Sequence, residues 1–283
     1  MAYPNISAPY GLKPINLIGG QVFAGSTRSL PIQYGYGTNI FYGDFVVLSR
    51  GFITRAAVST GTAANQVTGI FLGVNFTNPI TKQKQFSQFW PANTLAGDAE
   101  AVVCDDPDTV FKAVVCSGTT VVASGSLAMI GTNLSMIDNG SVASSLSTGN
   151  SANAVLAPTA TPVTTILPVR CVGVVPDTAI TVSATGSSSS TTITLTGTGL
   201  PIAIPVGTAV GYLAANGQLI STGSFVTAAA VAGATSVTIN AQPTVLGAGA
   251  NIPAASTIVF TQYPEILVKM NLLVHGYYSS ATA

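Results

Sequence analysis

Few side chains in this sequence could carry out acid–base, nucleophilic or metal chemistry. The chain has nine Lys or Arg residues, nine Asp or Glu residues and one histidine, His275, among 283 residues. A Ser–His–Asp triad would have to use this histidine, which lies in a strand-like run near the C-terminus. Neither a Gly-x-Ser-x-Gly motif nor a phosphate loop ending in Gly-Lys-Ser/Thr is present. We therefore expect a structural or surface role for His275, and we predict no catalytic residue and no cofactor.

The one acidic cluster consists of Asp105, Asp106 and Asp108. Three carboxylates within four residues could contribute to a Ca²⁺ site. The EF-hand pattern is missing, because no Gly stands at its sixth position and no Glu at its twelfth. We favour a solvated turn in which one Asp caps the backbone. We predict no metal site, and this turn is where a metal would be sought first.

The three cysteines, Cys104, Cys116 and Cys171, fit no disulfide framework and no zinc spacing. Each has a valine neighbour in a strand-like run. We therefore expect buried, reduced thiols that behave as small apolar residues. A Cys104–Cys116 bridge across a hairpin is the alternative.

Side chains that could bind nucleic acid or sugar are equally few. Net charge is zero and no basic cluster exceeds Lys82–Lys84, whereas nucleic acid needs a concentrated cationic surface. The aromatic residues Phe86, Phe89 and Trp90 could stack on sugars or bases, but packing in a core or an interface is the commoner use. Prolines and glycines interrupt the most apolar window, 200–215, so no run reaches the length of a transmembrane helix. We predict no nucleic acid partner and no membrane partner.

The scarcity of charge is the strongest compositional signal. Charged residues make up 6% of the chain, against about 25% in ordinary soluble domains. Between Asp138 and Glu265 only Arg170 and Asp177 are charged. Net charge near zero promotes association, and catalysis needs the residue types that are scarce here. The composition favours a protein that binds other protein within an assembly.

The elements that position these residues are expected to be strands. Gly, Ser, Thr, Val and Ala dominate, and 29 Gly and 16 Pro divide the chain into short pieces. Such a pattern predicts an all-β fold, a barrel or sandwich. We expect a hairpin over 43–56, a helical stretch at 150–157, and strands at 68–76, 83–90, 99–104 and 109–116.

Composition also predicts the domain organisation. Residues 1–22 are expected to form an extended arm, because Pro4, Pro9 and Pro14 exclude a continuing helix. The start shows neither the charged nor the apolar region of a secretory signal. From 177 to 262 the chain is dominated by Ser, Thr, Ala, Gly and Val, whereas 265–278 regains charges and aromatics. We predict a β-rich body over 23–176 plus 263–283, and an inserted β-domain over 177–262.

Within the predicted insertion, Ile193 and Leu195 alternate with threonines and should lie on one face of a strand. Residues 187–190 are expected to form a flexible tip before it. Asn216-Gly217 predicts a hairpin with a type I′ turn. The segment from Gly207 onward also echoes the one from Gly43, which either two related barrels or the general pattern of hairpins would explain.

Several phrases of the sequence resemble virion structural proteins of tailed phages, particularly marine ones. They are Tyr10-Gly-Leu-Lys-Pro-Ile-Asn-Leu-Ile-Gly-Gly, Tyr36-Gly-Thr-Asn-Ile-Phe-Tyr-Gly-Asp, Gly69-Ile-Phe-Leu-Gly-Val and Asp105-Asp-Pro-Asp-Thr-Val-Phe. The Gly-Asp-x-Val and Gly-Ile-x-x-Gly-Val patterns are similar to those of small β-rich capsid decoration (cement) proteins. The resemblance covers residues 8 to about 176 and the final 20, and leaves 177–262 outside it.

The resemblance implies a non-enzymatic protein of the virion that binds the outer capsid surface and bridges neighbouring capsomers. Its partner would be the major capsid protein, and we expect a homo-oligomer, with a trimer favoured. An extended arm could clamp a neighbouring subunit by strand addition, and aromatic side chains could serve as buried anchors. The expected interface residues are Tyr3, Pro4, Tyr10, Leu12, Pro14, Leu17 and Phe23.

Two other functions stay open at this stage. A tail, fibre or knob protein that contacts the host surface would suit a Ser/Thr/Gly-rich β-domain equally well. A glycan hydrolase or esterase on a β-scaffold is the enzymatic alternative, and its activity would have to depend on His275 or the acidic cluster.

Overall fold

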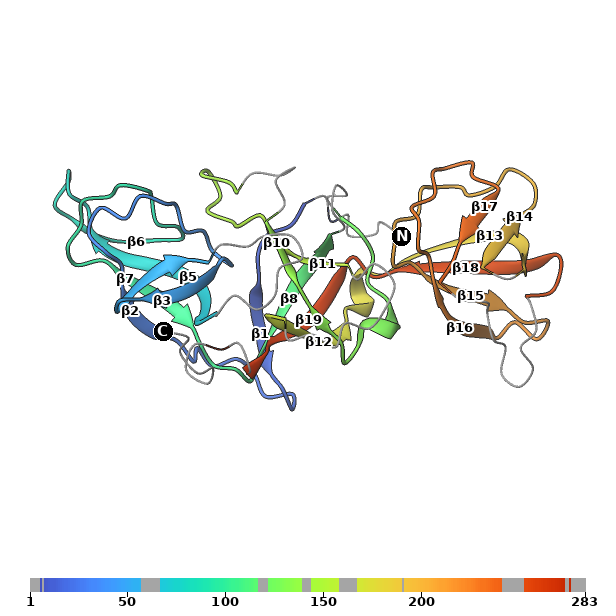
Figure 1. Ribbon diagram of the computed structural model, residues 1–283, viewed down its shortest axis with the longest axis horizontal. Coiled ribbons are helices and arrows are strands. Elements are labelled where there is room, and N and C mark those ends of the chain that lie inside the picture. The colour runs from blue at the N-terminus through green and yellow to red at the C-terminus, as the bar shows by residue number, and fades with distance from the viewer. Residues whose placement is uncertain are drawn as a thin grey trace.

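The computed structural model describes residues 6, 8–56, 67–116, 122–138, 144–157, 167–189, 191–240, 252–272 and 275. Regular structure in these residues consists of nineteen strands and two 3₁₀ turns, η1 (Leu127–Met129) and η2 (Pro176–Thr178). The predicted all-β class is therefore confirmed. The strands form three β-units that lie in a row along the longest axis of the molecule (Figure 1).

The unit at one end, which we call the first barrel, is a nearly closed sheet with the order β2-β7-β5-β3-β4, and β6 pairs with β5. An isolated bridge between Ile32 and Ile53 brings the two outer strands together. Its strands are β2 (Arg28–Pro31), β3 (Phe45–Ser49), β4 (Phe52–Arg55), β5 (Gly69–Thr77), β6 (Lys84–Ser87) and β7 (Glu100–Cys104).

The middle unit, the central sheet, has the order β10-β11-β8-β19-β12-β9, and β1 pairs with β8. The last described strand of the chain thus lies in the middle of this sheet, between β8 and β12. Its strands are β1 (Lys13–Leu17), β8 (Thr109–Cys116), β9 (Asn133–Leu134), β10 (Met136–Asp138), β11 (Asn153–Leu156), β12 (Val169–Val174) and β19 (Glu265–Met270).

The third unit, the second barrel, has the order β16-β15-β18-β13-β14-β17 and is brought close to closure by a bridge between Val226 and Ile239. It occupies 180–262, within the range predicted as an insertion. Ile193 and Leu195 are both buried on one face of β14, as their alternation predicts. Its strands are β13 (Ile180–Ser189), β14 (Thr192–Leu195), β15 (Ala209–Leu213), β16 (Leu219–Phe225), β17 (Ser236–Thr238) and β18 (Ser256–Gln262).

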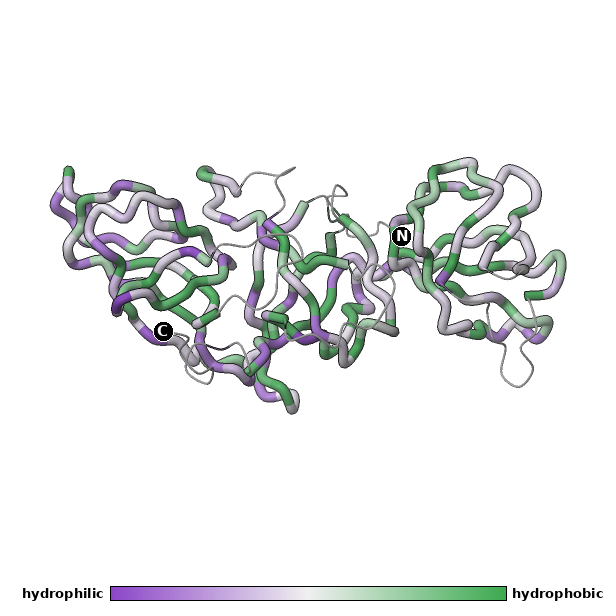
Figure 2. Tube along the Cα trace, viewed as in Figure 1, coloured by the Kyte–Doolittle hydropathy of each residue, from purple (hydrophilic) through white to green (hydrophobic). Residues whose placement is uncertain are grey.

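The apolar cores join the units unequally. One cluster of buried residues runs from the first barrel into the central sheet and includes Phe45, Ile70, Phe111 and Val268. The first barrel also has a core of its own around Trp90, with members between 32 and 103. Among the described residues, the only core of the second barrel is a separate one whose members all lie between 182 and 260. In Figure 2 strongly hydrophilic segments recur along the first barrel and the central sheet, whereas the second barrel is mostly pale or green. The range predicted as one body therefore holds two sheets with a shared core.

The expected hairpin over 43–56 and the strands at 68–76, 99–104 and 109–116 are confirmed within one or two residues, whereas the strand expected at 83–90 is shorter and ends at Ser87. The helix expected at 150–157 is wrong. Asn153–Leu156 is β11, which pairs with β10 and runs parallel to β8. Pairing with two strands outweighs the weak helical preference of this alanine-containing segment.

Two turn predictions are also corrected. Residues 187–189, expected in a flexible tip, extend β13 and pair with β14. Of Asn216 and Gly217 only Gly217 has positive φ, at 80°, and the Ala214 N–H donates to the Gln218 carbonyl at 2.9 Å. A type I′ turn needs positive φ at both central residues, so this is a three-residue loop. Arg50 and Gly51, with φ of 51° and 86°, meet the type I′ condition instead.

Candidate functional site

The residues predicted as a partner interface lie mostly against the chain's own body. Tyr3 and Pro4 fall outside the described residues. Pro14 and Leu17 belong to β1 and are half-buried beside β8, and Phe23 packs on the core shared with the first barrel. Leu12 is fully buried in that core. Leu12 is therefore corrected from a partner contact to a core residue, because its side chain has no surface left for a neighbour.

Tyr10 fixes the same segment by polar contacts. Its hydroxyl donates to the Glu265 carboxylate at the start of β19, and Lys112 Nζ lies 3.3 Å from the same carboxylate. Lys13 Nζ sits 4.2 Å from the centre of the Tyr10 ring, a cation–π contact. Lys13 and Lys112 are direct partners across β1 and β8, so the carboxylate and the ring offset the repulsion between two like charges.

Burial and Glu265 also shape the chemistry of Tyr10. Desolvation raises the pKa of the Tyr10 hydroxyl, and the hydrogen bond to Glu265 and its negative charge raise that pKa further. The hydroxyl therefore stays protonated and acts as a donor. The described part of the arm, from Tyr10 to Leu17, is held on the central sheet by a backbone ladder, a buried leucine and this charged cluster.

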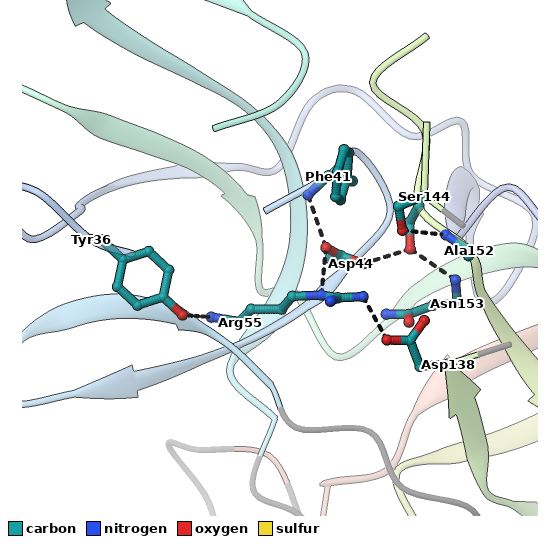
Figure 3. A network of polar contacts seen from close by, with 9 residues as sticks. Tyr36, Phe41, Asp44, Arg55, Asp138, Ser144, Ala152 and Asn153 are labelled. Atoms are coloured by element: carbon teal, nitrogen blue, oxygen red, sulfur yellow. Dashed lines mark hydrogen bonds and ion pairs between the residues drawn. The ribbon is translucent and has the colours of Figure 1, made fainter. Parts of the chain in front are cut away.

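A buried polar network joins the first barrel to the central sheet (Figure 3). Asp44, just before β3, is fully buried and lies 3.0 Å from Arg55 Nε at the end of β4. Arg55 Nη2 reaches Asp138 of β10, also at 3.0 Å. One guanidinium thus bridges carboxylates from two units. The Arg55 backbone N–H donates to the Tyr36 hydroxyl at 3.0 Å, which fixes the base of the same residue.

Hydrogen bonds complete the shell around Asp44. The Ser151 hydroxyl donates to Asp44 Oδ1 at 2.5 Å, and the Phe41 N–H donates to Oδ2 at 2.8 Å. Desolvation raises the pKa of the Asp44 carboxyl, while Arg55, Phe41 and Ser151 act against that rise. The negative charge of Asp44 therefore depends on these partners. The network links the first barrel to the central sheet by buried polar contacts.

The acidic cluster is divided among three different contacts. Asp105 pairs with Arg28 of β2, and Asp108 Oδ1 lies 3.7 Å from Lys269 Nζ of β19. Asp106 Oδ1 accepts the Asp108 N–H at 2.9 Å, which is the backbone-capping turn favoured above. Among the described residues, no group of three or more His, Cys, Asp or Glu side chains is arranged to hold a metal ion.

His275 is buried where the chain returns to the first barrel. Its backbone forms an isolated parallel β-bridge with Val67, and its Nε2 lies 2.9 Å from the Asp105 carbonyl oxygen. Burial lowers the pKa of His275 despite the nearby carbonyl and carboxylate of Asp105. Its contacts are those of a structural residue that ties the C-terminal segment to the loop after β7.

The three cysteines are buried and none of them is in a disulfide, so the Cys104–Cys116 bridge is absent. Desolvation raises the pKa of Cys171 to about 11 and also raises that of Cys104. Thiols in this state are poor nucleophiles at neutral pH.

A different junction joins the central sheet to the second barrel. Gly207, before β15, has φ of 85°, and a Cβ at this position would lie 1.8 Å from the Ser124 carbonyl oxygen. The Ser124 N–H donates to the Val206 carbonyl at 3.1 Å, and the Ser124 hydroxyl accepts the Tyr263 N–H at 2.8 Å. This junction is therefore held by backbone groups and the Ser124 hydroxyl, whereas an ion-pair bridge joins the first barrel to the central sheet.

Among the described residues, the first barrel exposes six large apolar side chains, whereas the second barrel exposes four. Phe86 is 63% exposed and Ile80, at the β5–β6 turn, is 88% exposed. Of the aromatic group noted in the sequence, Trp90 is buried edge-on against Phe76 and Phe89 stacks on Phe41. The expected packing role is therefore confirmed for Trp90 and Phe89, whereas the Phe86 side chain lies at the surface. The exposed residues within this unit are Tyr34, Leu48, Phe52, Ile80, Phe86 and Leu95.

Comparison of the chain with protein-family models, curated proteins and solved structures finds no match. No helix among the described residues is long and apolar enough to span a membrane.

Sequence reasoning missed the two polar joints. Asp44 stands alone in the apolar run from Phe41 to Leu48, and Glu265 stands directly before the apolar residues of β19. A single acid inside a strand-forming run is a usable signal of a buried ion pair, since Asp and Glu are almost never fully buried unless paired. The partners cannot be found in this way, because Arg55, Asp138 and Tyr10 are brought close only by the assembled sheets.

Proposed function

We propose that this protein is a non-enzymatic virion structural protein of a tailed phage, and that it decorates the outer surface of the capsid by binding the major capsid protein. One observation carries the proposal: the first barrel, at one end of a row of three β-units (Figure 1), exposes six large apolar side chains among the described residues, against four on the second barrel at the other end. Such a molecule can attach at one end and reach toward a neighbouring capsomer.

The kind of attachment follows from the residues available. The first barrel exposes two aromatic rings that are more than half accessible, Tyr34 and Phe86, together with Ile80 and Leu95. Aromatic side chains in desolvated pockets are typical interface anchors. A specific interface buries about 800 Å² on each partner. These exposed side chains would supply part of that area, and neighbouring backbone and polar groups would supply the rest.

Apolar attachment also suits a chain with few charges. In water as salty as the sea, the Debye length is roughly 4 Å, between the values for 0.1 M and 1 M salt. Exposed ion pairs contribute little under such conditions, whereas burial of apolar area persists. The second barrel, with few charged residues and a Ser/Thr-rich sequence, is placed outward in this proposal.

Binding to capsids that lack the protein tests the proposal. Purified protein should sediment with such heads and raise their resistance to heat. The double variant Ile80→Ser with Phe86→Ser should weaken binding at least tenfold. The double variant Leu213→Ser with Leu219→Ser, which removes two exposed residues of the second barrel, is the matched control and should bind normally.

Two results would overturn the proposal. If the two double variants weakened capsid binding equally, the first barrel would not be the attachment site. Location of the protein only on the tail would favour the tail or fibre alternative. We also expect a homo-oligomer, with a trimer favoured, which sedimentation equilibrium of the free protein measures directly.

A further inference from the structure

The strand β6 (Lys84–Ser87) is an open edge of the first barrel (Figure 1). It pairs with β5 on one side, and no other described strand lies on its second side. The outer strands β2 and β4 of the same barrel are instead brought together by the bridge between Ile32 and Ile53. Because a strand edge presents unpaired N–H and C=O groups, it is a template for pairing with another chain.

The register of β6 shows which backbone groups face the open side. The Asn78 N–H donates to the Gln83 carbonyl at 2.9 Å, and the pairing of β5 with β6 continues from there without interruption. Hydrogen-bonded and non-hydrogen-bonded pairs alternate along an antiparallel ladder. Gln85 is therefore bonded to β5, whereas the N–H and C=O groups of Lys84 and Phe86 point away from it. Among the described residues, these four outward groups have no hydrogen-bond partner.

The side chains at this edge favour an apolar and an acidic neighbour. Phe86 is 63% exposed, and its ring lies against Gly73 of β5, where an added Cβ would come within 2.5 Å of the ring. The ring therefore offers an apolar surface beside the open edge. Lys84 lies on the same face of β6 and forms no salt bridge among the described residues. An acidic side chain opposite Lys84 would complement its charge.

We propose that β6 receives an extended segment of the major capsid protein as an additional strand. This inference rests on the proposed attachment of the first barrel to the shell, and it names the contact that orders that attachment. The added strand exchanges hydrogen bonds with the outward groups of Lys84 and Phe86. Opposite these residues it carries an acidic and an apolar side chain, two positions apart. In such pairing the backbone supplies affinity and the alternate side chains supply specificity.

Two features of β6 favour the shell over a second copy of this chain. An edge of four residues falls well short of the roughly 800 Å² that each partner buries in a specific interface, so it does not hold two free copies together. On the shell, the added strand joins the apolar contact of Ile80. Pairing of two β6 strands would also bring Lys82 and Lys84 of both copies to one seam, and lysines at an edge disfavour such pairing.

Proline at an outward-facing position tests the added strand. Proline is tolerated in an edge strand where the missing N–H faces solvent, so Lys84→Pro should fold with an unchanged circular dichroism spectrum. It leaves one carbonyl of the added strand without a donor, which should weaken binding to heads that lack the protein by roughly tenfold or more. Lys84→Ala, the matched control, removes the same charge and keeps the N–H, so it should weaken binding by only about threefold.

Hydrogen exchange of single amides tests the same strand in the unaltered protein. In the free protein the amides of Lys84 and Phe86 should exchange quickly and that of Gln85 slowly, because only Gln85 is bonded to β5. When the protein is bound to heads, exchange at Lys84 and Phe86 should slow by roughly tenfold or more, while Gln85 stays slow. A loss of fold would have the opposite effect, since it would speed exchange at Gln85.

The outcomes separate this inference from the proposed function. If Lys84→Pro bound heads as well as Lys84→Ala, or if Lys84 and Phe86 exchanged equally fast on and off the heads, no strand would be added. Weakened binding of the Ile80→Ser, Phe86→Ser double variant would then still support attachment through the first barrel. Dissociation of a free oligomer by Lys84→Pro would assign the edge to a second copy and overturn the inference. Failure of the unaltered protein to bind heads would overturn both.

Discussion

The first and second barrels are attached to the central sheet by different kinds of contact. The first barrel shares a continuous apolar core with that sheet and adds a buried bridge from Asp44 through Arg55 to Asp138. The second barrel keeps its own core and meets the sheet through backbone hydrogen bonds around Ser124 and a close approach at Gly207. The first barrel has its own core around Trp90 as well, but the shared core couples its folding to the central sheet, whereas a unit with only a separate core can fold alone.

The chain enters and leaves each barrel on paired strands. Ile180 and Gln262 are direct partners in an antiparallel ladder at the second barrel, as Arg28 and Val103 are at the first. The ends of the second barrel are therefore about 5 Å apart, and a short linker can replace it. The first barrel differs in its packing, because Phe45 and Ile70 on its inner side belong to the core shared with the central sheet.

The largest expected effect comes from separating the units. Residues 177–262 alone should fold, with a strand-type circular dichroism spectrum and a cooperative urea transition. The chain from which 178–261 are excised should also fold. Residues 23–105 alone should be clearly less stable than the second barrel despite their inner core, since the core shared with Phe111 and Val268 would be open to water. An unfolded 177–262 fragment beside a folded 23–105 fragment would reverse the comparison.

Removal of the Asp44 carboxylate should cost the next largest amount. Asp44→Ala leaves the partly buried Arg55 guanidinium without the buried one of its two carboxylate partners and the Ser151 hydroxyl without its acceptor. Breaking a buried pair in this way lowers the free energy of unfolding by about 3 kcal/mol or more. Urea denaturation measures the change. Asp98→Ala, at an exposed position that contacts Thr77, is the control and should be close to wild type. A loss below about 1 kcal/mol at Asp44 would show that the bridge is not a structural joint.

A pair of glycine variants examines the other junction. Gly207 and Gly217 have similar positive φ, 85° and 80°, but a Cβ would collide with Ser124 only at Gly207 and would meet nothing within 4 Å at Gly217. Gly217→Ala should therefore cost only the left-handed backbone penalty, roughly 1 kcal/mol. Gly207→Ala should cost a further 1–3 kcal/mol for overpacking and should reduce hydrogen-exchange protection of the Ser124 amide. Equal effects of the two variants would mean that the close approach is not required.

The smallest expected effect is the contribution of His275 to the pH dependence of the free energy of unfolding. Burial lowers the pKa of His275 in the folded protein, so the unfolded chain, with a pKa near 6.5, takes up a proton that the folded chain resists. The free energy of unfolding should therefore fall as pH decreases through about 6.5. Because this is the only histidine, His275→Gln should remove that part of the slope. If the free energy of unfolding of the variant depended on pH as strongly as that of the wild type, His275 would not be the cause of this pH dependence.

Local patterns predicted much of this fold. Alternation and turn residues located the strands of the first barrel other than β2 (Arg28–Pro31), because those signals lie within a few residues of each strand. The change of composition near 177 coincides with the start of the second barrel. The pairing partners of β11 come from distant segments, and the helix expected there was wrong for that reason. At Asn216-Gly217 the dipeptide was compatible with two loop lengths, and the strand register selected the longer one.

The candidate sites were less predictable than the strands. Tyr10 and Leu12 were predicted to contact a partner, because proline excludes helix but does not say whether an extended segment lies along its own body or along a neighbour. The structure pairs that segment with β8. The Asp105 cluster shows the reverse case, since its local turn was foreseen while its partners, Arg28 and Lys269, required the assembled sheets.

The most direct test of the whole account is a reconstruction of the intact phage particle by electron cryomicroscopy, with density assigned to this chain. The account predicts an elongated density on the outside of the head, with the first barrel and Phe86 against the shell and the second barrel pointing away from it. Density confined to the tail, or a second barrel seated on the shell, would contradict it.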